Sequence, residues 1–122
     1  MILVDTSIWI DHLRGGDPSL VALLQSNRVV THDYVIGEIA LGTLFKRNVI
    51  LDSLDNLPKL PLATDPEVRH LIEREKLFGR GIGYVDAHLI AAVKLAPGTE
   101  LWTRDKRFRS VLEALGLSAQ FH

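Results

Sequence analysis

The hydrophobic positions of this chain form two kinds of segment that alternate along the sequence. Short continuous apolar runs are typical of buried strands, and the clearest ones lie at 2–4, 28–31 and 101–103. Two weaker strand candidates lie at 60–62 and 119–121. Between the runs, apolar residues recur every three or four positions, which predicts helices over 7–14, 18–26, 33–47, 48–56, 65–77, 85–96 and 105–115.

Alternation of buried strands with helices predicts an α/β fold around a central, mainly parallel sheet. The length of 122 residues is that of one ordinary domain, and no linker or repeat divides the chain, so we expect a single domain over residues 1–122. The segment 85–96 is apolar on every side except at Asp86, His88 and Lys94. Such a pattern predicts a helix packed in the interior.

Composition excludes several classes of site. The chain has no cysteine, which excludes disulfides, thiolate zinc sites and cysteine nucleophiles, and which fits a reducing cytoplasm as its location. No apolar run is long enough to cross a bilayer, so we expect no membrane association. The net charge of −1 is not that of a purely electrostatic nucleic-acid binder. Any nucleic-acid site must therefore combine locally acidic and locally basic groups.

Four carboxylates fall where an α/β fold places its ligands. Asp5 directly follows the strand 2–4, Asp105 follows the strand 101–103, and Asp86 opens the interior helix. Glu38 lies in mid-helix among apolar neighbours and is expected to face a cleft or a partner. Ligands of open parallel sheets bind beyond the carboxyl ends of the strands. Clustered carboxylates repel one another, and a hard divalent cation such as Mg²⁺ or Mn²⁺ relieves that repulsion.

Helix capping is the alternative interpretation of these acids. Aspartate is a favoured N-cap residue, and capping taken alone explains Asp5, Asp86 and Asp105. It does not explain Glu38, which lies inside its helix. Because a carboxylate has two oxygens, one group can serve as cap and ligand at once, and both interpretations stay open.

Basic residues surround Asp105 at the start of the last predicted helix. Cations are disfavoured at a helix N-terminus, so we interpret Arg104 and Lys106 as contacts for nucleic-acid phosphates. Arg107 and Arg109 are interpreted as a solvated helix start. Zinc-protease, serine-hydrolase and P-loop motifs are absent from the sequence. A phosphatase with an aspartate nucleophile would need a second aspartate at position 7, where Ser7 stands.

Four ordered segments resemble the PIN domain, and specifically the VapC-type toxins of toxin–antitoxin pairs. They are Leu3-Val4-Asp5-Thr6-Ser7, Gly37-Glu38-Ile39-Ala40-Leu41-Gly42, Gly83-Tyr84-Val85-Asp86-Ala87-His88-Leu89-Ile90-Ala91-Ala92 and Leu101-Trp102-Thr103-Arg104-Asp105-Lys106-Arg107-Phe108. The resemblance implies a three-layer α/β/α fold and a Mg²⁺-dependent endoribonuclease, with Mn²⁺ as a substitute. It also implies RNA as substrate, a VapB-like antitoxin as partner and a homodimer.

The resemblance also implies roles for individual residues. Asp5 and Asp86 would bind the metal directly, while Glu38 and Asp105 would act directly or through water. Thr6 and Thr103 would orient carboxylates. A catalytically inactive PIN-like module that binds RNA or protein is the alternative, and the four intact acids count against it. The apolar segments 18–26 and 39–57 predict surfaces for a second copy and for an antitoxin segment that extends a basic residue toward the acids.

Overall fold

The computed structural model describes residues 1–121 as a series of short strands and helices. The strands are β1 (Ile2–Val4), β2 (Val29–Val30) and β3 (Glu100–Trp102). The helices are α1 (Thr6–Gly15), α2 (Pro18–Gln25), α3 (Asp33–Ala40), α4 (Arg47–Asp55), α5 (Asp65–Arg74), α6 (Tyr84–Lys94) and α7 (Lys106–Ala114). Strands and helices therefore alternate as the sequence pattern predicted.

The sheet has the order β2-β1-β3, and both pairings are parallel. In the central strand, Leu3 is opposite Val30 on one side and Leu101 on the other, and Val4 is opposite Trp102. The register continues past the strand, because the backbone N–H of Asp5 donates to the carbonyl of Trp102 at 2.9 Å. The first residues after β1 and β3 consequently lie side by side.

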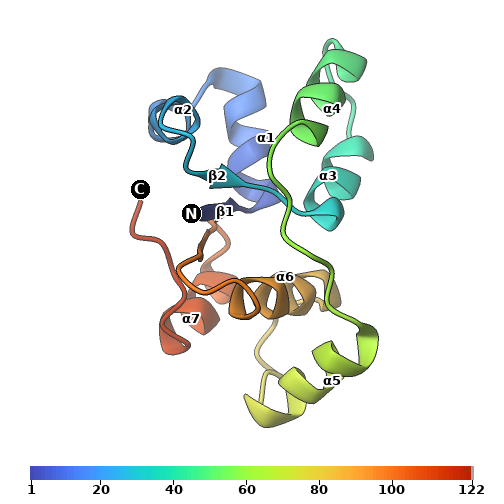
Figure 1. Cartoon of the computed structure of the whole chain (residues 1–122), viewed down its shortest axis with the longest axis vertical. Helices are drawn as coiled ribbons and strands as arrows, with labels where there is room; N and C mark the ends of the chain where they lie inside the picture. Colours follow the sequence, from blue (N-terminus) through green and yellow to red (C-terminus); the bar gives the residue numbers. More distant parts are fainter. Residues whose placement is uncertain (122) are drawn as a thin grey trace.

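Helices cover both faces of the sheet. In Figure 1, α1 to α4 lie on one side of the strands and α5 to α7 on the other. Parallel strands need long crossover connections, and helical crossovers bury both sheet faces. The arrangement is the expected three-layer α/β/α fold.

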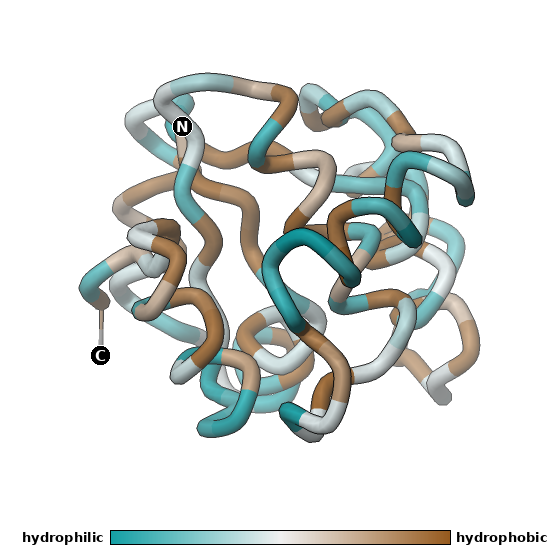
Figure 2. Tube along the Cα trace, turned by 90° about the horizontal axis from the view of Figure 1, so that it is seen from below, coloured by the Kyte–Doolittle hydropathy of each residue, from teal (hydrophilic) through white to brown (hydrophobic). Residues whose placement is uncertain are grey.

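The buried apolar residues form a continuous core around β1. All three β1 residues are buried, and so are the seven consecutive residues 87–93 of α6. Several hydrophobic stretches of the trace pass through the middle of the molecule, coloured brown in Figure 2. The interior position predicted for the helix over 85–96 is therefore confirmed. Among residues 1–121, no helix has both the length and the apolar character needed to cross a membrane.

Two sequence-based predictions of local structure were wrong. The helix predicted over 33–47 ends at Ala40, whose carbonyl accepts a hydrogen bond from Arg47, and the chain turns before α4 begins. The turn ends at Lys46, which has the left-handed φ of 53°. The weak strands at 60–62 and 119–121 are replaced by single bridges, from Thr31 to Lys59 and from Leu101 to Ser118.

The central position of β1 generates a stability prediction. Leu3 is fully buried, and its truncation leaves a cavity between both helical layers. Leu3→Ala should lower the free energy of unfolding by roughly 3–5 kcal/mol. Leu41→Ala is the matched control, because Leu41 is 90% exposed and its truncation should change stability by less than about 0.5 kcal/mol. Urea denaturation measures both, and similar values for the two variants would contradict this core.

Candidate functional site

The fold brings the four acids to one end of the sheet. Asp5 follows β1 and Asp105 follows the neighbouring strand β3, while Glu38 comes from α3 and Asp86 from the first turn of α6. The negative charges of Asp5, Glu38 and Asp105 all raise the pKa of Asp86, so the four groups lie within electrostatic range of one another. We call these four residues the acidic site.

Asp5 lies at the centre of a hydrogen-bond network between the two strands. The side chain is buried, and its Oδ2 accepts hydrogen bonds from Thr103 Oγ1 at 2.7 Å and from Ser7 Oγ at 3.0 Å. Ser7 Oγ also accepts the backbone N–H of Arg104 at 3.1 Å. Within residues 1–121 no hydrogen bond reaches Oδ1 of Asp5, so one oxygen is positioned and the other is available to a ligand.

Capping does not account for Asp5. It occupies the N-cap position of α1, but its side chain makes no capping hydrogen bond. Asp86 lies in the third position of α6, where its Oδ2 accepts the backbone N–H of Gly83 at 3.0 Å. Of the four acids, only Asp105 is a conventional N-cap, because its side chain accepts the backbone N–H of Phe108 at 3.0 Å. Asp5 is thus oriented by two hydroxyls and not by capping, which leaves its second oxygen for a ligand.

Glu38 is exposed, yet its carboxylate is held in place. Thr6 Oγ1 donates to Glu38 Oε1 at 2.6 Å and so ties α3 to the start of α1. Thr6 and Thr103, the two hydroxyls that sequence reasoning selected, thus each contact a carboxylate of the acidic site. Sequence reasoning missed Ser7. Its position two residues after Asp5 was the available signal, because the turn from strand to helix points both side chains to the same end of the sheet.

The pKa of Asp86 is raised well above its ordinary value. Burial makes the largest contribution and the negative charges of Asp5, Glu38 and Asp105 add to it, while the hydrogen bond from Gly83 opposes them, and together these effects bring the pKa to about 6. Among the described residues, none of the four acids has a cation within 4 Å. The negative charge of the acidic site is therefore not balanced by the protein.

The donor set fits a hard divalent cation. All the side-chain donors are carboxylate or hydroxyl oxygens, which Mg²⁺ and Mn²⁺ prefer. Within residues 1–121, no three histidine or acidic side chains already converge on a common metal position. Each carboxylate instead keeps its own local hydrogen bond. Mg²⁺ binds through one or two carboxylates and retains several waters, so such a site does not need three protein ligands in contact.

The two basic residues selected from the sequence differ in their surroundings. The Arg104 guanidinium is bound by Asp11 and Asp17, and it also lies 5.5 Å from the ring centre of Trp102. It would have to leave these carboxylates to hold a phosphate, so this geometry does not favour the predicted RNA contact of Arg104. Lys106 is exposed in the first turn of α7, and within residues 1–121 it forms no ion pair.

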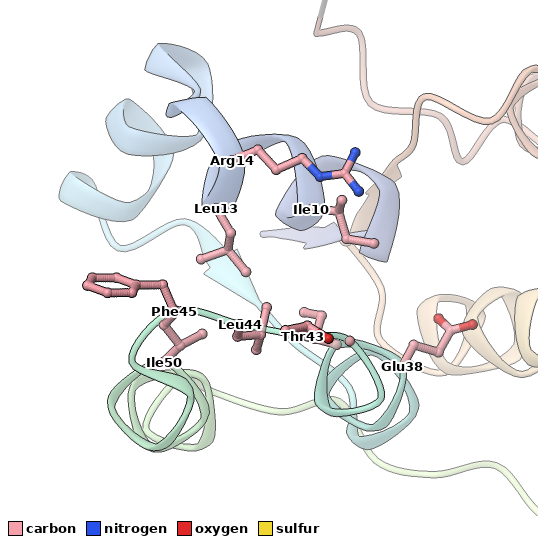
Figure 3. Close-up of a pocket in the computed structure, with 10 residues that line it drawn as sticks. Ile10, Leu13, Arg14, Glu38, Thr43, Leu44, Phe45 and Ile50 are labelled. Carbon is pink, nitrogen blue, oxygen red and sulfur yellow. The ribbon is translucent and has the colours of Figure 1, made fainter.

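An apolar groove leads away from the acidic site. It lies between α1 and the α3–α4 region and has a volume of about 270 Å³. Figure 3 shows Glu38 at one end and Phe45 and Ile50 at the other, with Ile10 and Leu13 on the α1 wall. Phe45 is 84% exposed. The groove therefore joins an uncovered hydrophobic surface to one of the four carboxylates.

The remaining candidates from the sequence lie in the interior. His88 is buried and its Nε2 is 3.0 Å from Asp65 Oδ1, and Trp9 and Trp102 are core residues. His88 and both tryptophans therefore belong to the interior and do not contribute to the acidic site.

Comparison with known proteins agrees with this geometry. Two curated relatives are both named Ribonuclease VapC32 and come from two strains of Mycobacterium tuberculosis, CDC 1551 / Oshkosh and ATCC 25618 / H37Rv. Each is 48% identical to this chain over 118 residues, which is 97% of this chain and 95% of the relative. Residues 2–113, which include the whole acidic site, match the family described as PIN domain. The chain therefore belongs to the PIN domain family.

Proposed function

We propose that this protein is a VapC-type toxin, an endoribonuclease that hydrolyses RNA phosphodiester bonds with Mg²⁺ or Mn²⁺ bound at the acidic site. The observation that carries the proposal is a group of four interacting carboxylates with no protein cation to balance them. The high identity to proteins named ribonucleases supports it. The RNA substrate and the absence of cysteine fit a cytoplasmic location.

The residues of the acidic site and their neighbours have different roles in the proposed reaction. Asp5 and Asp86 hold the cation, and Thr103 and Ser7 keep Asp5 in one orientation through its Oδ2. Glu38, fixed by Thr6, and Asp105, fixed as a cap, act on the cation directly or through water. When bound, a divalent cation activates water and stabilises the charge that develops on the phosphodiester. Lys106 binds an RNA phosphate beside the acids.

The central prediction separates metal ligands from caps and from an inactive binding module. Asp5→Asn and Asp86→Asn should fold, because an amide oxygen still accepts the local hydrogen bonds, but both should lose nearly all RNA cleavage and most of the Mg²⁺-induced rise in Tm. Thr103→Val should cost roughly 10–100-fold in activity through Asp5. Cleavage of a short RNA and Tm are measured with Mg²⁺ and with EDTA.

The control for these variants is Asp52→Asn, which removes an exposed carboxylate from α4, away from the acidic site. It should keep wild-type cleavage and metal response. Undiminished cleavage in EDTA, or wild-type activity in Asp5→Asn, would contradict the proposed mechanism. A wild-type protein that binds RNA but never cleaves it in Mg²⁺ or Mn²⁺ would instead favour the inactive module.

The pKa of Asp86 predicts how the stability of the metal-free protein depends on pH. The pKa is about 6 in the folded protein against an ordinary value of 3.8. As pH rises from about 4 to 6, the unfolded chain loses its proton first, so the free energy of unfolding should fall. Asp86→Asn should remove this fall and be more stable at pH 7 by on the order of 1–2 kcal/mol, allowing for partial exposure to solvent. Urea titrations in EDTA at pH 4.5 to 7.5 measure the free energy of unfolding of the wild type and of Asp86→Asn. If it depends on pH in the same way in both proteins, Asp86 is not the group responsible.

The apolar groove supports a proposal about partners. We propose that a VapB-like antitoxin lays an apolar segment along the groove and extends a basic residue toward Glu38 and its neighbours. The groove provides exposed apolar side chains at one end and the Glu38 carboxylate at the other, with Arg14 on the α1 wall, so an apolar segment with charged groups of both signs suits it. We also propose that the toxin forms a homodimer, because exposed apolar residues such as Phe78 and Tyr84 lie outside the groove, on the α5–α6 side.

One substitution distinguishes the two contacts. Phe45→Ser should weaken the complex with an antitoxin encoded next to the toxin gene, because the burial of an aromatic ring contributes about 1.5–3 kcal/mol, and it should leave RNA cleavage unchanged. Phe78→Ser is the matched control, with a ring 62% exposed outside the groove. Light scattering detects the toxin–antitoxin complex in coexpressed protein and the toxin homodimer in isolated protein. Equal antitoxin affinity of Phe45→Ser and Phe78→Ser would argue against binding in the groove. A monomeric wild-type toxin at high concentration would argue against the dimer.

A further inference from the structure

Arg107 packs against the backbone of the glycine-rich loop that leads into α6. A Cβ atom built on Gly81 would lie 2.7 Å from Arg107 Cδ and 3.1 Å from its Nη1, closer than atoms can approach without displacement. Gly81 also has a φ of +80°, which side-chain-bearing residues rarely adopt. The positive φ is therefore the constraint that favours glycine at this position, and the absence of a side chain also lets the Arg107 side chain lie directly over the loop.

This contact places Arg107 at the edge of the acidic site. Arg107 is the second residue of α7 and lies two positions after Asp105. The loop that it covers continues to Gly83, whose backbone N–H binds the carboxylate of Asp86. The arginine thus spans the two segments that carry Asp86 and Asp105.

The charge of Arg107 is not neutralised by the protein. Among residues 1–121 it forms no ion pair, whereas Arg104, three positions earlier, is bound by two carboxylates. It also lies in the first turn of α7, where the helix dipole disfavours a cation. Arg107 is exposed, as expected of a solvated helix start, but its side chain lies against Gly81 and has no carboxylate partner among the described residues. Its guanidinium is therefore free to bind an external anion, and its planar donors match the oxygens of a phosphate.

We propose that Arg107, positioned by Gly81, binds a backbone phosphate of the RNA next to the phosphodiester that the acidic site cleaves. The proposal rests on the proposed ribonuclease function and adds a substrate-binding residue to it. Arg107 makes no ion pair with the acids themselves, so its phosphate is a flanking one. Its contribution is to RNA affinity and register, not to the chemical step.

The test compares charge with packing at this position. Arg107→Met keeps an aliphatic side chain over Gly81 and removes the charge, whereas Arg107→Lys keeps both the aliphatic chain and the charge. Arg109→Met is the control, because it removes an exposed charge two positions further along α7. Arg107→Met should raise KM for a short single-stranded RNA roughly tenfold or more, because a charge-assisted hydrogen bond to the RNA is lost, and should change kcat by less than about twofold. Arg107→Lys should recover much of the loss, and Arg109→Met should resemble the wild type.

RNA binding is measured separately by fluorescence anisotropy in an Asp86→Asn background, so that the result does not depend on cleavage. The slope of log affinity against log salt concentration should fall in magnitude by about 0.7 when one phosphate contact to single-stranded RNA is lost. Gly81→Ala should weaken RNA binding without changing the net charge.

The possible outcomes are distinct. An unchanged KM and an unchanged salt slope in Arg107→Met would overturn the proposal. A loss of RNA binding in Gly81→Ala without a loss in Arg107→Met would also overturn it, because the contact would then serve packing alone. An equal loss in Arg109→Met would also overturn it. Failure of the ribonuclease function itself is recognised differently, by a wild-type protein that cleaves no RNA in Mg²⁺ or Mn²⁺. The Mg²⁺-induced shift in Tm of Arg107→Met should equal that of the wild type, which shows that the acids are undisturbed.

Discussion

The parallel pairing of β1 with β3 determines how Asp5 and Asp105, two of the four acids, lie relative to each other, and Glu38 and Asp86 join them from α3 and α6. The pairing sets Val4 opposite Trp102 and continues through the hydrogen bond from Asp5 to Trp102. It thereby brings the Thr103 hydroxyl to the Asp5 carboxylate. A shift of one residue in this register would move every side chain of a strand to the opposite face. The packing of both helical layers against β1 stabilises that register, so the core helps to keep the residues of the acidic site in place.

Local hydrogen bonds hold the acidic site against its own electrostatic repulsion. Asp5 is held by two hydroxyls, Glu38 by Thr6, Asp86 by the backbone of Gly83 and Asp105 by its capping bond. No protein cation approaches the group among the described residues. The raised pKa of Asp86 reflects its burial first and the charges of the other three acids second. The fold thus holds four carboxylates close together without a protein cation to offset their repulsion, which is the reason for the proposal that a divalent cation binds there.

Much of the fold and the positions of the acids could be predicted from the sequence, because both depend on local patterns. Apolar runs identified β1 and β3, and each acid following a strand was expected at the carboxyl end of the sheet. Contacts between distant segments were not readable in the same way. The ion pairs that occupy Arg104 come from Asp11 and Asp17, about 90 positions away. The contact of Arg107 with Gly81 requires α7 to approach a loop that is distant in sequence, and the carbonyl of Ala40, where α3 ends, accepts a hydrogen bond from Arg47 seven positions later. The periodicity of apolar residues along the sequence does not predict any of these contacts.

The separation in sequence of the two strands has a consequence for synthesis of the protein. Thr103, the hydroxyl partner of Asp5, is synthesised 98 positions after it. Strand β1 can pair with β2 early, but the β1–β3 pairing waits until the roughly hundred residues between these strands have been made, and such long-range parallel pairing is slow. Nascent and truncated chains that end before β3 therefore carry the first acids without an assembled site. For a cell that makes a nuclease able to act on its own RNA, the order of strands in the sheet delays activity until β3 and Asp105 have been synthesised.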